Sequence, residues 1–134
     1  MSRQRNIEIA RTLLEGIGQG RDPEDIAAPF AKDLVFEVQG DADAMPWIGR
    51  RTGRQAMADF LRDLRALTEP LSFDVDDILA SDDRAAIVGA LRTRIRTTGK
   101  VMASQFAIVL TIADGVVTRF QMLEDSFALS RAAR

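Results

Sequence analysis

The sequence predicts a single α+β domain in which helices cover one face of a bent, mostly antiparallel sheet. Two observations carry this prediction. Apolar residues follow a helical spacing through much of the chain up to Leu67, and they alternate along the chain from Pro70 onward. The chain has 134 residues, of which 46% are hydrophobic, so residues 1–134 fit one domain with a core of its own.

Two helices are expected before the first strand. The first has one apolar face that fades into glycines, formed by Ile7, Ala10, Leu13 or Leu14, and Ile17. The second helix is short. Asp22 suits its N-cap, Pro23 suits its first position, and Pro29 is expected to end it early.

The middle of the chain predicts a strand, a loop and a third helix. Residues 34–39, "LVFEVQ", alternate as a strand, and an acidic loop that carries Trp47 follows them. Thr52 and Gln55 have the spacing of a capping box for the third helix. The apolar stripe of this helix is the clearest in the chain and consists of Met57, Phe60, Leu61, Leu64 and Leu67.

Four strands are expected in the second half, in "LSFDVDDILA", "RAAIVGALRTRIR", "KVMASQFAIVLTIA" and "VVTRFQMLED". Short joints separate them, and the last joint, "ADG", is typical of a tight hairpin turn. Because strands joined by such turns are antiparallel, these four form a meander. A last helix is expected in "SFALSRAAR".

Composition excludes several classes of function. A net charge of −2 argues against general binding to nucleic acid or anionic membranes, and no apolar run is long enough for a signal peptide or a membrane span, so a cytoplasmic location is expected. The chain has no cysteine, histidine or tyrosine. Any general acid or base must therefore be a carboxylate, a lysine or an arginine. Asp74 and Asp76 form either a weak cation site or, as we expect, a solvated strand face, so neither metal nor cofactor is predicted.

Four stretches, "FAKDLVFEV", "PWIGRRTGRQAMADFL", "TGK…ADG" and "FQMLEDSFAL", resemble the SnoaL-like, nuclear transport factor 2-like superfamily, which includes ketosteroid isomerases and limonene epoxide hydrolases. The resemblance covers nearly the whole chain. It implies a cone-shaped barrel of strongly bent sheet closed by three helices from the N-terminal half, with a pocket inside. It also implies a homodimer formed through the outer sheet face, and a loop over the mouth of the cone that folds Trp47 inward.

The catalytic positions of both enzyme groups lack their functional residues here. The isomerase base falls at Val38, and the isomerase tyrosine falls within residues 11–14, which contain none. The hydrolase positions fall at Gly89, Leu91 and Met122. By alternation, Arg92, Arg94 and Arg96 lie on the opposite face, as an exposed or dimer-facing row.

Alternation also predicts the lining of the cone. The expected ligand-binding residues are Phe36, Val38, Trp47, Met57, Phe60, Leu91, Thr93, Ser104, Phe106, Ile108, Phe120 and Met122. Glu124 shares this face, where desolvation should raise its pKa and suit it to acid–base catalysis. The alternatives are that Glu124 lies in water at the rim or helps Asp125 and Ser126 to cap the last helix. Trp47 is either a lid over a ligand or a plug in an empty cavity.

These observations predict that the protein binds a small, mostly apolar metabolite. Glu124 would support isomerase, cyclase, hydrolase or dehydratase activity without a cofactor. The alternative is a non-catalytic module that carries a ligand or mediates dimerisation. A homodimer is expected because one row on the outer face is too apolar to be left in water: Val88, Ala90, Ala103, Ala107 and Val109.

Overall fold

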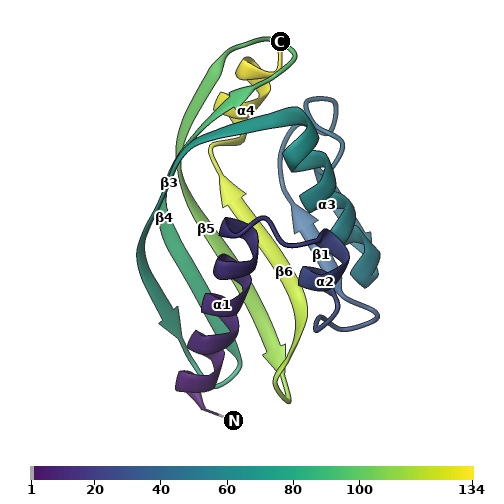
Figure 1. The fold of residues 1–134 in the computed structure, drawn as a ribbon, viewed down its shortest axis with the longest axis vertical. Coiled ribbons are helices and arrows are strands. Elements are labelled where there is room, and N and C mark those ends of the chain that lie inside the picture. Colours follow the sequence, from purple (N-terminus) through teal and green to yellow (C-terminus); the bar gives the residue numbers. More distant parts are fainter. Residues whose placement is uncertain (1) are drawn as a thin grey trace.

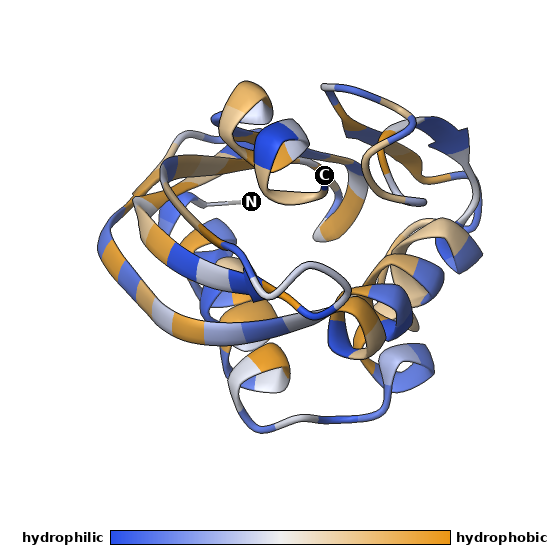
Figure 2. Ribbon diagram, turned by 90° about the horizontal axis from the view of Figure 1, so that it is seen from above, coloured by the Kyte–Doolittle hydropathy of each residue, from blue (hydrophilic) through white to orange (hydrophobic). Residues whose placement is uncertain are grey.

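The computed structural model describes residues 2–134, and these form an α+β fold with one six-stranded sheet and four helices (Figure 1). The strand order is β2-β1-β6-β5-β4-β3. The ladder does not join β2 to β3, so the sheet is curved but open, and the expected cone of bent sheet closed by helices is confirmed. Figure 2 shows the strands curving around an interior that helices cover on the remaining side.

Each of the two N-terminal helices begins after a residue whose side chain caps it, and the cap of the second helix is the predicted one. Helix α1 (Arg3–Gly18) follows Ser2, whose hydroxyl accepts a hydrogen bond from the Arg5 backbone N–H at 3.1 Å. It packs across β3 and β4. Helix α2 (Pro23–Ala27) follows Asp22, whose carboxylate accepts from the Glu24 N–H at 2.8 Å.

The loop that carries Trp47 leads into a strand that the sequence analysis missed. Strand β1 (Val35–Val38) pairs antiparallel with β2 (Gly49–Thr52). Thr52 therefore lies in an extended strand opposite Val35, and the predicted capping box is wrong. Helix α3 (Arg54–Leu67) begins after Gly53, which has a φ of 114° and provides no side-chain cap.

Helix α3 buries three residues of the predicted stripe, leaves Leu64 and Leu67 partly buried, and passes directly into the meander. Met57, Phe60 and Leu61 are buried, and the helix ends at Thr68, whose hydroxyl donates to the Leu64 carbonyl at 2.6 Å. Strand β3 (Thr68–Ala80) has register shifts at two points along its pairing with β4 (Arg84–Ile95). These irregularities help the sheet to bend.

The second half of the chain confirms the meander. Strand β5 (Val101–Ala113) pairs antiparallel with β4 and with β6 (Val116–Glu124). Asp114 and Gly115 both have positive φ in the tight turn between β5 and β6, as the Asp-Gly pair predicts. Helix α4 (Ser126–Ala132) follows β6. In the described part of the chain, no helix combines the length and apolar character that a membrane span requires.

Strand β1 joins the meander through a parallel pairing with β6. Phe36 lies opposite Phe120, and Val38 lies opposite Met122. This long-range pairing brings the aromatic residues of the first half of the chain against the inner face of β6.

Candidate functional site

A cavity of about 390 Å³ lies between the inner face of the sheet and the helices. Its polar lining residues are Arg65, Thr68, Ser72, Thr93 and Glu124. The rest of the lining is apolar or glycine: Leu14, Ile17, Gly18, Trp47, Phe60, Leu61, Leu64, Pro70, Phe73, Val75, Leu91, Ile95, Met102, Ile108, Phe120, Met122 and Leu129. The site is an apolar chamber with few polar groups.

The structure brings most of the sequence-predicted site residues to this wall. Glu124 lines the cavity together with seven of the expected ligand contacts: Trp47, Phe60, Leu91, Thr93, Ile108, Phe120 and Met122. The other five are not among the described residues that line it: Phe36, Val38, Met57, Ser104 and Phe106. Those five residues therefore lie off the wall of this cavity, and their contact with a ligand stays a prediction.

Packing or hydrogen bonding explains why each of these five residues lies off the cavity wall. Phe36, Val38 and Met57 are at most 1% exposed and belong to the core. The Ser104 hydroxyl accepts a hydrogen bond from the Asp125 backbone N–H at 2.8 Å, so it serves the junction between β6 and α4. Phe106 packs on Phe73, which itself lines the cavity.

Trp47 is part of a connected cluster of rings. It is 3% exposed, and its ring meets Phe60 edge-on with centroids 5.5 Å apart. Phe60 also contacts Phe36 at 5.3 Å and Phe120 at 6.0 Å. Trp47 therefore forms one wall of the cavity while its ring is almost fully buried.

Strand β3 provides another wall that the sequence analysis did not assign to the site. Phe73 stacks on Phe106 with centroids 4.7 Å apart and planes at 21°. The Phe106 ring can reach Phe73 because the ring lies over Gly89, which has no side chain. A Cβ at Gly89 would lie 3.1 Å from the Phe106 ring. Phe73 and Val75 alternate with exposed aspartates, and this alternation is the signal that could have assigned them to the inner face.

The helices also contribute residues that the sequence analysis did not assign to the site. Leu14 and Ile17 come from α1, Arg65 from α3 and Leu129 from α4. The helical spacing of apolar residues predicted one apolar face for α1. It could not show that the C-terminal end of this face, with Leu14 and Ile17, lines a cavity.

Glu124 ends β6 directly opposite Phe106 of β5. Burial raises the pKa of its carboxyl to about 7, and the negative charge of Asp125 contributes to the same shift. Within residues 2–134, no group donates a hydrogen bond to this carboxyl. Asp125 is the cap of α4, accepting from the Ala128 N–H at 2.9 Å, so Glu124 is not needed for that role.

The other polar side chains on the cavity wall differ in whether they are free to contact a ligand. The Thr68 hydroxyl already donates to Leu64. Arg65 is an exposed residue of the last turn of α3, and it reaches the cavity wall from there. The described residues contain no cluster of three or more metal-ligating side chains. The arrangement therefore offers one acid–base group in an apolar chamber.

The arginine row lies away from this chamber. Arg92, Arg94 and Arg96 are exposed, and none of them lines the cavity. Arg94 pairs with Glu69 at 3.2 Å, and the Arg96 Nε donates to the Thr68 carbonyl at 3.1 Å.

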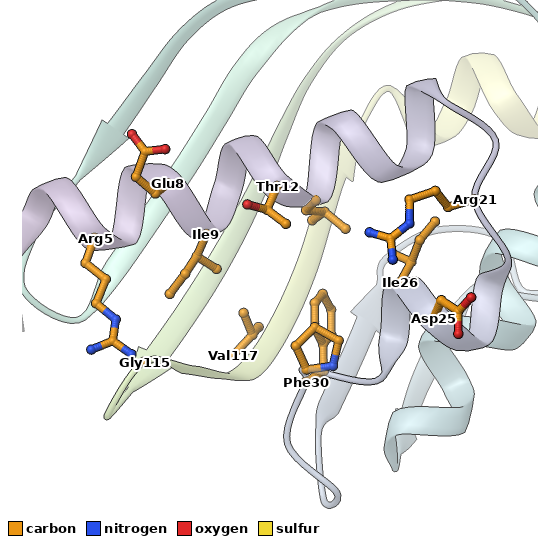
Figure 3. Close-up of a pocket in the computed structure, with 12 residues that line it drawn as sticks. Arg5, Glu8, Ile9, Thr12, Arg21, Asp25, Ile26, Phe30, Gly115 and Val117 are labelled. Carbon is orange, nitrogen blue, oxygen red and sulfur yellow. The ribbon is translucent and has the colours of Figure 1, made fainter.

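A second pocket of about 320 Å³ lies between α1, α2 and the β5–β6 turn (Figure 3). Ile9, Ile26 and Phe30 contribute apolar surface, and Arg5 and Arg21 lie at its two ends. None of the described residues that line it also lines the cavity of about 390 Å³ (the cone cavity), so the two pockets are separate.

Comparison with solved structures places this geometry in a known fold. An NTF2-like protein from Burkholderia xenovorans is 25% identical, with a TM-score of 0.88 over 100% of this chain and 99% of that one. A proposed polyketide cyclase from Xanthomonas campestris is 20% identical, with a TM-score of 0.77 over 100% of both chains. A Catenulispora acidiphila protein with a ketosteroid isomerase-like fold, in complex with trimethylamine, is 19% identical, with a TM-score of 0.68 over 87% of this chain and 84% of that one.

Sequence comparison gives the family. No curated protein matches the chain. The family model of the SnoaL-like domain matches residues 10–120, from the middle of α1 to the middle of β6. The chain therefore belongs to the SnoaL-like domain family.

Proposed function

We propose that the protein binds a small, mostly apolar metabolite in the cone cavity and acts on it through Glu124, without a cofactor. One observation carries the proposal: among the described residues that line the cavity, Glu124 is the one carboxylate. An acid–base group works best when its pKa is close to the working pH, and burial raises the pKa of Glu124 to about 7. Isomerisation, cyclisation, hydrolysis and dehydration are reactions that one such group can promote.

A non-catalytic carrier is the second candidate, and a specific observation favours it. The positions that hold catalytic groups in the enzymes that the sequence resembles include Val38, Gly89, Leu91 and Met122 here. Val38 is buried in the core, while Leu91 and Met122 line the cavity as apolar side chains. A carrier would use the same cavity and would bind without turnover.

Binding and turnover can be measured separately because the chain has one tryptophan, and it lines the cavity. Small cyclic ketones, epoxides and alcohols should change the Trp47 emission saturably. Any turnover found among them should be abolished in Glu124→Gln and retained in Glu15→Gln, where the same change is made on the exposed side of α1.

The outcomes separate the candidates. Turnover lost only in Glu124→Gln supports the enzyme, and turnover that persists in that variant would rule out the role of Glu124. Saturable binding without turnover of any compound supports the carrier. A complete absence of saturable binding would overturn both.

A further inference from the structure

The Glu124 carboxyl faces an apolar chamber without a partner of opposite charge. No ion pair reaches it within residues 2–134, and the negative charge of Asp125, the next residue in the chain, raises its pKa further. A carboxylate in such surroundings is costly unless it is protonated or paired with a cation. The chamber therefore favours a ligand that brings a positive charge or a hydrogen-bond donor.

The aromatic walls favour the same kind of ligand. Phe73 uses one face to stack on Phe106, and it lines the cavity while 45% of its surface is exposed. Trp47, Phe60 and Phe120 line the cavity as well. Aromatic ring faces carry partial negative charge and attract ammonium groups. The rings and Glu124 thus act together, in favour of a cation and against an anion.

The strand register places Glu124 opposite Phe106, whose ring leans the other way, toward Phe73 of β3. Glu124 lies opposite Phe106 in the β5–β6 pair, and Phe106 lies opposite Gly89 in the β4–β5 pair. Because Gly89 has no side chain, the Phe106 ring lies over it and stacks on Phe73 of β3. The ring packs toward β3, on the side of β5 away from Glu124.

Arg65 is the one cationic side chain that lines the same cavity among the described residues, and it does not offset this preference. Its side chain is exposed at the last turn of α3, where water solvates the guanidinium, and it makes no ion pair with Glu124. An anionic ligand would therefore have only this peripheral contact and would meet the charges of Glu124 and Asp125.

We propose that the ligand of the cone cavity is a small apolar amine, bound as an ammonium ion by Glu124 with its hydrocarbon part against Trp47, Phe60 and Phe73. This inference rests on the function proposed above, since it names the ligand class of the same site. A bound ammonium keeps Glu124 ionised, which is the form that accepts a proton. The apolar side chains of the wall would pack against the hydrocarbon part of the amine.

Three probes of one shape and different charge test this proposal: cyclohexylmethylamine, cyclohexylmethanol and cyclohexanecarboxylate. Their binding to the whole protein is measured at pH 7 by Trp47 emission and by calorimetry. A charged hydrogen bond adds enough free energy for the amine to bind roughly tenfold or more tightly than the alcohol. The carboxylate should bind most weakly.

Glu124→Gln should lower amine affinity to the level of the alcohol and leave alcohol affinity unchanged, whereas Glu15→Gln should change neither. In the unaltered protein, amine affinity should rise between about pH 6 and pH 8 as Glu124 ionises, because an alkylammonium stays protonated over this range. Of the other charged side chains, Asp125 follows Glu124 in the chain and Arg65 lines the same cavity. This pH series uses no variant, so it tests the proposal even where Glu124→Gln folds poorly.

The results that would overturn the proposal are distinct from those that would overturn the proposed function. Equal binding of amine and alcohol, tightest binding of the carboxylate, or an amine preference that survives in Glu124→Gln would each overturn the amine inference and leave a cavity that binds apolar ligands. Failure of all three probes to bind would overturn both.

Discussion

Glu124 is an ionisable side chain in a buried position, so its protonation should make the free energy of unfolding depend on pH. Its pKa in the folded protein lies near 7, above the ordinary value of 4.5. The folded state therefore holds the proton more tightly than the unfolded state does. The contribution of this group to stability is largest below about pH 4.5 and is lost as the pH rises toward 7.

We predict that Glu124→Gln removes this loss. Between pH 4.5 and 7 the free energy of unfolding of the unaltered protein should fall by up to about 3 kcal/mol more than that of the variant. Urea unfolding at several pH values measures the difference, with Glu15→Gln as the control that should follow the unaltered protein. Parallel curves for Glu124→Gln and the unaltered protein would show that the carboxyl is solvated.

Trp47 contributes to stability through its contact with Phe60. Replacing it with alanine removes a large buried ring, so the free energy of unfolding should fall by roughly 3–5 kcal/mol. Trp47→Phe keeps a ring against Phe60 and should retain most of that stability. Native emission should also be blue-shifted. Emission typical of tryptophan in water, together with a small effect of the alanine variant, would place the ring outside the wall and would remove both the lid and the plug interpretations.

At the scale of elements, the sequence predicted what depends on local periodicity. The stripe of α3, the caps of α2 and the Asp-Gly turn each depend on residues a few positions apart. Strand β2 was missed because "GRRT" carries no apolar alternation and only its pairing with β1 reveals it. The parallel pairing of β1 with β6, and the register shifts of β3, depend on contacts between distant residues.

In the candidate site, too, the features set by local alternation were predicted and those set by contacts between distant residues were not. Strict alternation correctly placed Leu91, Ile108 and Glu124 on one face of the sheet. It could not show that Phe106 leans over Gly89 or that Ser104 accepts from Asp125, because these depend on packing in three dimensions.

Gly89 is where two strands approach too closely for a side chain. A Cβ at this position would collide with the Asp74 carbonyl of β3 and would press on the Phe106 ring. Gly89→Ala should therefore destabilise the protein by about 1–3 kcal/mol and loosen the β3 edge. Gly18→Ala, in α1, has open space around its Cβ and should have little effect. Thermal unfolding and amide exchange in β3 compare the two, and equal stability of both variants would contradict this account of the β3–β4 contact.

At the scale of the whole molecule, the outer sheet face bears on assembly. The predicted row on β4 and β5 is extended in the structure by Leu79 and Leu123, which are 55% and 40% exposed and pair with Ala86 and Ala107. Such a continuous apolar surface is more favourable when it is covered. We expect a second copy of the chain to cover it.

This expectation can be tested by light scattering, which should report twice the chain mass at micromolar concentration. Ala107→Glu places a charge in the centre of the face and should give monomers. Ala66→Glu makes the same change on the exposed side of α3 and should leave the dimer intact. A monomeric unaltered protein would refute the dimer.

The cavity with its single carboxylate is the central feature of the whole molecule, and the protonation of Glu124 tests it most directly. NMR of the Glu124 side-chain carboxyl carbon, followed from about pH 3 to pH 9, should show a midpoint near 7 in the unaltered protein. A midpoint close to the ordinary value of 4.5 would show that the carboxyl lies in water and would contradict the account of the site.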